Sequence, residues 1–208
     1  MDHGSAIHRP TAVARRTREN ELSGTIDTDE RAAVDAVLAG DRDAFRILVD
    51  RESAAVIRAC HRILGDLHEA EDAAQEAFVT AFRSLSAWRG DGPFGAWLTR
   101  IAVRISLRRA ARRRDVTWID PADPSRGVDV PGGPDPMATA LRAERAADVR
   151  AAVSRLDEPY RETVALRFFG DLSLDEIATQ TGRPLGTFKT HLHRGLLRLR
   201  AAVEGGVG

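Results

Sequence analysis

Cysteine, lysine and tyrosine are almost absent from this chain of 208 residues, in which each occurs once. The single cysteine, Cys60, excludes an intramolecular disulfide and a cysteine-rich zinc site. No apolar run reaches the length of a membrane span, and the N-terminus lacks the apolar segment of a signal peptide. We therefore expect a soluble, cytoplasmic protein.

An excess of one charge sign is also missing, because 31 basic residues balance 31 acidic ones. The total charge consequently indicates nothing about a polyanionic partner, and only the local distribution of charge can. The sequence shows no Ser/His/Asp arrangement, no metal-ligand spacing and no phosphate-binding loop. We expect no catalytic residues, no metal, no cofactor and no enzymatic activity.

What the chain does have is helical periodicity, in two separate stretches. Apolar residues recur at helical spacing over residues 29–114 and again over residues 137–203. Residues 1–28 are polar and aperiodic, which predicts a flexible tail, and residues 115–136 form an acidic linker rich in proline and glycine. The pattern predicts an all-α fold of two small helical domains joined by that linker.

The last helices of the second domain have the pattern of a helix-turn-helix. Ser173 and Glu176 have capping-box spacing, and Gly182 and Pro184 mark a turn before a second helix. Leu197 is expected on the exposed side of that helix, where it packs against a partner or is simply tolerated. The polar face suits phosphates and base edges in a major groove, although a solvated helix at the end of a bundle is the alternative. That face carries Thr187, Lys189, Thr190, His191, His193, Arg194 and Arg198.

The first domain ends in an arginine-rich helix that follows a Gly/Pro loop. Arg100, Arg104, Arg108 and Arg112 recur every four residues and align along one side, with no acidic residue among them. Such a row attracts a phosphate backbone. The neighbouring aromatic residues suggest stacking on unpaired bases, although most aromatics in such a segment belong to a core.

A strongly amphipathic helix is expected over residues 66–86, just before that loop. Acidic residues in its first turns suit the helix dipole and need no functional explanation. An outward strip of Asp72, Gln75 and Glu76 extends beyond those turns. It is a candidate docking surface for a basic partner, with a solvated face as the equal alternative.

Two stretches of the chain resemble a known family. Residues 70–104, AEDAAQEAFVTAFRSLSAWRGDGPFGAWLTRIAVR, are similar to region 2 of an extracytoplasmic-function (ECF, group IV) sigma factor of the sigma-70 family. Residues 156–200, LDEPYRETVALRFFGDLSLDEIATQTGRPLGTFKTHLHRGLLRLR, are similar to region 4. The resemblance implies a subunit that binds bacterial core RNA polymerase and promoter DNA, directs promoter recognition, melting and initiation, and is controlled by an anti-sigma factor.

The resemblance also implies roles for individual residues. Core polymerase would be bound by Asp72, Gln75 and Glu76. The minus-10 element would be contacted by Trp88, Arg89, Phe94, Trp97, Arg100, Arg104 and Arg108. The minus-35 element would be contacted by Thr187, Lys189, Thr190, His191, His193 and Arg194.

Two other classes of protein stay open at this point. A stand-alone helix-turn-helix regulator would carry a ligand-sensing or dimerising N-terminal domain and would bind free duplex tightly, whereas a sigma factor would bind polymerase well and free duplex poorly. An enzyme acting on nucleic acid would need His, Asp or Glu ligands at metal spacing, which the sequence does not offer.

Overall fold

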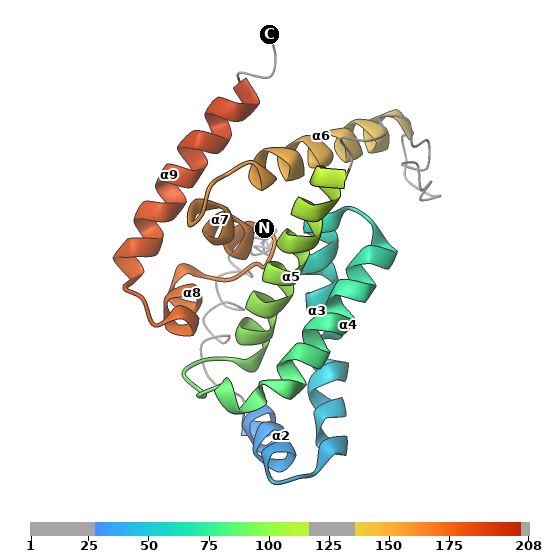
Figure 1. Ribbon diagram of the computed structural model, residues 1–208, viewed down its shortest axis with the longest axis vertical. Helices are drawn as coiled ribbons and strands as arrows, with labels where there is room; N and C mark the ends of the chain where they lie inside the picture. The colour runs from blue at the N-terminus through green and yellow to red at the C-terminus, as the bar shows by residue number, and fades with distance from the viewer. Residues whose placement is uncertain (1–27, 117–135, 205–208) are drawn as a thin grey trace, which may run out of the picture.

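The computed structural model describes residues 28–116 and 136–204, and in these ranges all regular structure is helical (Figure 1). The N-terminal half contains α2 (Thr28–Leu38), α3 (Phe45–Leu64), α4 (Leu67–Arg83) and α5 (Phe94–Val116), with short 3-10 helices η1 (Arg42–Ala44) and η2 (Leu85–Ala87). The C-terminal half contains α6 (Pro136–Ser154), α7 (Tyr160–Phe168), α8 (Leu174–Thr181) and α9 (Leu185–Glu204). The predicted all-α fold is confirmed.

The tail and most of the linker proposed from the sequence lie outside the described residues. At the edges of these segments, Thr28 begins α2, α5 continues to Val116, and α6 begins at Pro136. None of the described helices combines the length and the apolar character needed to cross a membrane.

The reversal between α3 and α4 follows from local chemistry. Gly65 ends α3 in the left-handed region, with a φ of 80°, and its N–H donates to the carbonyl of His61 at 2.9 Å. Asp66 caps α4 by accepting from the N–H of Glu69 at 2.8 Å, and this hydrogen bond lowers the pKa of the Asp66 carboxyl.

The helix expected over residues 66–86 ends earlier than predicted. The structure closes α4 at Arg83, and the Ser84 hydroxyl donates to the carbonyl of Thr80 at 2.7 Å. Serine favours such local hydrogen bonds over continued helix, so the chain turns into η2.

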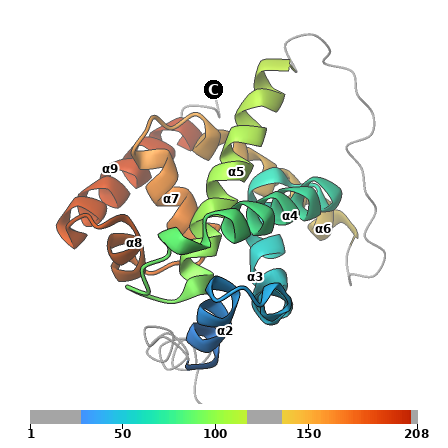
Figure 2. The ribbon, with the colours of Figure 1, turned by 60° about the horizontal axis from the view of Figure 1, so that its bottom comes forward.

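The core of the N-terminal half lies between α3, α4 and α5, and α2 crosses one end of these three helices (Figure 2). Leu48, Val56, Phe94 and Leu98 are completely buried there. Cys60 is buried as well, and burial raises the pKa of its thiol, so the only cysteine is a core residue. Small side chains let α4 approach its neighbours closely, namely Ala70, Ala73, Ala74, Ala77 and Ala81.

In the C-terminal half, α9 lies directly against α7. A Cβ on Gly195 would stand 2.8 Å from Cγ2 of Val164 and 3.4 Å from Cβ of Tyr160, so a glycine is needed for this close approach. Val164 packs in a small cluster with Val153 and Leu156, flanked by α9. This packing fixes the orientation of α9 on its domain.

The two halves contact each other through a hydrophobic cluster that the sequence did not predict. Helix α5 is buried on two sides: Leu98 and Ile105 face α3 and α4, while Val103 faces the C-terminal half. The shared cluster joins residues of both halves, namely Ile63, Ala96 and Val103 with Ala165, Leu166, Leu172, Ile177 and Phe188. Figure 1 shows α5 running between the two sets of helices.

Candidate nucleic-acid interface

The helix-turn-helix predicted from the sequence is present in α8 and α9. Ser173 accepts from the N–H of Glu176 at 3.1 Å, and the Glu176 carboxylate accepts from the N–H of Ser173 at 2.8 Å. This capping box fixes the start of α8, and Gly182 ends it with a φ of 66°. Ile177 and Phe188 are buried together and join the two helices.

The outer face of α9 carries most of the side chains expected there. Lys189, Thr190, His193 and Arg194 are exposed, while Thr187 is half-buried. Leu197 is 56% exposed, as predicted for this side of the helix. Arg198 points elsewhere: its guanidinium lies 4.3 Å from the centre of the Tyr160 ring and 3.5 Å from Asp157.

His191 is placed differently from its neighbours on α9. Its ring lies edge-on between Tyr160 and Phe188, with centroid distances of 5.8 and 6.0 Å, and its Nδ1 is buried. The residue therefore faces α7 rather than the open side of α9. His191 is half-buried, and its assignment to the minus-35 element stays a prediction.

The aromatic residues assigned to base stacking pack against one another in this structure. Trp88 and Phe94 are 6% and 0% exposed, and both belong to the core of the N-terminal half. Phe94 meets Trp88 edge-on at 6.0 Å and Trp97, which is half-buried, at 5.6 Å. Arg89 is the one exposed member of the four loop and aromatic residues assigned to the minus-10 element.

Helix α2 contacts the loop that leads into α5. The buried carboxylate of Glu30 accepts from the N–H of Phe94, which is one of the unpaired donors at the start of α5. The guanidinium of Arg31 lies over the Trp88 ring at 5.4 Å. Residues before the arginine-rich helix thereby set where that helix starts.

Glu52 of α3 lies close enough to Glu30 for the two carboxylates to repel each other, and this leads to a prediction about stability. Burial raises the pKa of the Glu52 carboxyl, and the charge of Glu30 raises it further, while Arg51 opposes both. The folded state then holds a proton more tightly than the unfolded state, so Glu52 costs stability as the pH rises through its folded pKa. We expect Glu52→Gln to raise the melting temperature at pH 7 by about 1–3 °C.

Thermal melts at a series of pH values check this expectation. The gain should shrink as the pH falls through the raised pKa of the Glu52 carboxyl, because the native carboxyl then becomes neutral as well. Glu144→Gln, on the exposed face of α6, should give no such pH-dependent gain. An advantage of Glu52→Gln that stays constant from pH 8 to below the ordinary pKa of a glutamate would show that burial of the charged carboxylate is not its cause.

Several arginines of α5 form ion pairs with carboxylates, which the sequence did not suggest. Arg109 pairs with Glu76 at 2.6 Å, and Arg113 pairs with Glu69 at 2.7 Å, so α4 supplies carboxylates to one side of the helix. Arg108 lies beside these ion pairs and stays exposed. The sequence showed no acidic residue within the row, but the fold brings acidic residues from other helices.

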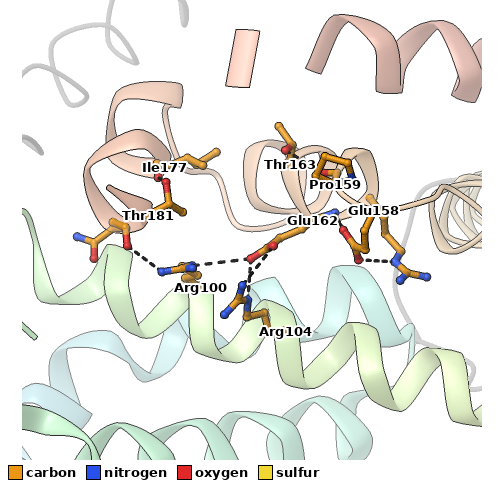
Figure 3. Close-up of polar contacts among 10 residues, drawn as sticks. Arg100, Arg104, Glu158, Pro159, Glu162, Thr163, Ile177 and Thr181 are labelled. Carbon is orange, nitrogen blue, oxygen red and sulfur yellow. Dashed lines mark hydrogen bonds and ion pairs between the residues drawn. The ribbon is translucent and has the colours of Figure 1, made fainter. Parts of the chain in front are cut away.

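Arg100 and Arg104 turn toward the C-terminal half. Arg104 donates to Glu162 of α7 at 2.7 Å, and Arg100 lies 3.8 Å from the same carboxylate (Figure 3). Arg100 also donates to the carbonyl of Gln180 in α8 at 2.7 Å. Burial is the main cause that lowers the pKa of Arg100. The sequence analysis did not single out Glu162 or Gln180. The only signal was that the arginine row has no acidic residue of its own, so its partners had to come from other helices.

The acidic strip on α4 lies where the sequence predicted. Asp72, Gln75 and Glu76 are all exposed, and Glu76 is also the partner of Arg109. The strip is therefore accessible to another macromolecule.

Comparison with known proteins identifies the family. Residues 48–116 match Sigma-70 region 2, and residues 146–199 match Sigma-70 region 4. The chain is 32% identical over 170 residues to the ECF RNA polymerase sigma factor SigW of Bacillus subtilis (strain 168), covering 79% of this chain and 91% of SigW. The chain belongs to the ECF sigma factors of the sigma-70 family. It is an RNA polymerase sigma factor.

Other relatives agree with this assignment. The ECF RNA polymerase sigma-E factor of Escherichia coli (strain K12) is 31% identical over 173 residues, covering 79% of this chain and 89% of that protein. The fold resembles the solved structure of CnrH in complex with the cytosolic domain of CnrY, with a TM-score of 0.55 and 23% identity over 86% of this chain and 99% of that one. These matches favour a sigma factor over the two alternatives, a stand-alone regulator and an enzyme acting on nucleic acid.

Proposed function

We propose that this sigma factor binds bacterial core RNA polymerase through α4 and reads two promoter elements through α5 and α9. The exposed polar face of α9 is the observation that carries the proposal. A capping box and a glycine turn present this face as the second helix of a helix-turn-helix, which is the element that enters a major groove. Contacts to the minus-35 element come from Thr187, Lys189, Thr190, His193 and Arg194.

The minus-10 element is contacted by the arginines of the N-terminal half. Arg89, Arg104 and Arg108 are exposed, and Arg100 is half-buried. Guanidinium groups bind phosphates and bases of an opened strand, and this binding free energy offsets part of the cost of unpairing the promoter. Trp88 and Phe94 are buried in the core, and from there they support the loop.

The remaining expectations are proposals of the same kind. We place the protein in the cytoplasm with its polymerase and in group IV of the sigma-70 family. Polymerase supplies the catalysis, and the sigma factor supplies recognition. An anti-sigma factor is the proposed regulator.

Glu76→Ala tests the polymerase-binding strip. We expect about a tenfold weaker affinity for core polymerase, the equivalent of about 1.4 kcal/mol, because an exposed carboxylate on the docking face is lost. The measurement is titration of core polymerase with labelled protein, followed by co-elution on a sizing column.

Glu69→Ala is the matched control, because Glu69 also lies on α4 and also pairs with an arginine of α5. Loss of such an exposed ion pair costs only about 0–1 kcal/mol of stability. Both variants should keep wild-type helicity. Equal affinity of Glu76→Ala and wild type for core polymerase would remove Glu76 from the docking face.

A further inference from the structure

Tyr160, the only tyrosine in the chain, lies against one face of α9 at three positions. The His191 ring meets the Tyr160 ring edge-on, with 5.8 Å between the ring centres. A Cβ on Gly195 would stand 3.4 Å from the Cβ of Tyr160, and the Arg198 guanidinium lies 4.3 Å from the centre of the tyrosine ring. These three positions of α9 have the spacing i, i+4 and i+7, so a single side chain of α7 follows α9 over two turns.

Arg198 has a second partner at the start of α7. The carboxylate of Asp157, in the turn before that helix, lies 3.5 Å from the Arg198 guanidinium. A guanidinium over an aromatic face is attracted by the ring, and the carboxylate adds a weaker, solvent-screened attraction. Both contacts tie Arg198 to its own domain, although the sequence placed this residue on the DNA-binding face.

Tyr160 contacts the side of α9 that is turned away from the exposed polar face. Lys189 and His193 each lie two residues from His191, which is more than about 150° around a helix of 3.6 residues per turn. Both of these side chains are exposed. A rotation of α9 about its own axis would therefore move the whole polar face relative to the rest of the domain.

The apolar contacts of α9 do less to fix this rotation. Leu192 and Leu199 are partly buried against the cluster of Val153, Leu156 and Val164. Such burial is non-directional, so it holds α9 close to the domain without selecting one rotation sharply. An edge-on ring pair and a guanidinium over a ring face do depend on direction.

We propose that Tyr160 is a positioning residue for promoter recognition, which fixes the rotation of α9 through Arg198 and His191, and that Arg198 supports minus-35 binding through Tyr160 rather than by touching DNA. Loss of this contact lowers the apparent DNA affinity to the extent that fewer molecules hold α9 in the binding-competent rotation. The inference rests on the proposed function, because it takes α9 as the helix that enters the major groove.

Four single variants and one double variant of the full chain test this role. Tyr160→Leu keeps an apolar side chain but removes the aromatic face, and Tyr160→Phe, which keeps the face, is its matched control. Arg198→Gln removes the guanidinium. Its control is Arg155→Gln, which removes the same charge from an exposed position before α7. The double variant Tyr160→Leu/Arg198→Gln completes a double-mutant cycle.

Each variant is assembled with core polymerase, isolated on a sizing column, and measured by competition binding with a duplex that the wild-type complex selects from a random library. We expect Tyr160→Leu and Arg198→Gln each to weaken binding about fivefold, the equivalent of about 1 kcal/mol. Tyr160→Phe and Arg155→Gln should stay within about twofold of wild type. The double variant should also lose about fivefold, because both changes remove the same contact.

The salt dependence of binding gives a readout that a merely structural role would not predict. A residue that contacts a phosphate contributes to the slope of log affinity against log salt, and its loss lowers that slope by about one. Arg198→Gln should weaken binding with the slope of wild type. Urea denaturation followed by circular dichroism should show that every variant remains folded.

Three results would overturn the proposal. A loss of about 25-fold in the double variant, or a smaller salt slope for Arg198→Gln, would show that Arg198 contacts DNA on its own. Wild-type affinity of Tyr160→Leu would show that the ring does not position α9. Equal losses in Tyr160→Phe and Tyr160→Leu would assign the effect to the hydroxyl group instead of the aromatic face.

Arg198→Gln changes an exposed side chain, so its affinity and salt slope decide the question even if Tyr160→Leu fails to fold. Failure of the proposed function gives a different result from failure of this inference. If α9 does not read the minus-35 element, the wild-type complex selects no duplex with a shared sequence in that segment. If only the inference fails, the wild-type complex selects such a duplex and the losses of the two single variants multiply.

Discussion

Replacement of Arg194 by alanine is expected to weaken binding of the polymerase complex to its minus-35 element by about 5- to 150-fold, which corresponds to about 1–3 kcal/mol. Arg194 is exposed on the polar face of α9. A guanidinium in this position can make two hydrogen bonds to one guanine edge, and alanine makes neither. The measurement is competition binding with a duplex selected from a random library by the wild-type complex.

Two comparisons separate base reading from phosphate contact. A base contact predicts that the variant loses discrimination at one position of the selected duplex, whereas a phosphate contact predicts uniform weakening on every duplex and a smaller salt slope. Arg46→Ala is the control for charge, because Arg46 is 85% exposed on α3 in the other half. Wild-type affinity of the Arg194 variant would contradict the assignment of α9 as the reading helix.

Replacement of Phe94 by alanine is expected to destabilise the N-terminal half by about 3–5 kcal/mol, the usual cost of truncating a buried phenylalanine. Phe94 is 0% exposed and touches the rings of Phe45, Trp88 and Trp97. Its removal leaves a cavity where α5 begins. Urea denaturation followed by circular dichroism measures the loss.

Phe94→Leu distinguishes the core role from base stacking. Leucine fills most of the space, so we expect a stability loss of less than about 1.5 kcal/mol and promoter opening close to wild type. A residue that stacks on an unpaired base would behave in the opposite way, because leucine has no aromatic face. If Phe94→Leu keeps wild-type stability but loses promoter opening, Phe94 stacks on a base.

The parts of the structure that could be predicted from the sequence depend on neighbours in the chain. The capping box of Ser173 and Glu176, the glycine turn at Gly182 and the stop at Gly65 each need only a few consecutive residues. The buried stripes follow from helical spacing alone. These features predict the all-α fold and the helix-turn-helix without any knowledge of tertiary contacts.

The parts that could not be predicted depend on which helices meet. Val103 and Arg104 are adjacent on α5, yet one lies in a core shared with the C-terminal half and the other pairs with Glu162. Periodicity assigns a residue to a face of its helix but not to a partner. The same limit explains His191, whose direction is decided by Tyr160 on another helix.

The most direct test of the account is transcription by bacterial core RNA polymerase on a library of linear templates with randomised minus-35 and minus-10 segments, with and without this protein. We predict transcripts with defined start points only when the protein is present, from templates that share one sequence in each segment. Absence of such transcripts, together with tight binding of the free protein to duplex DNA, would contradict the assignment as a sigma factor.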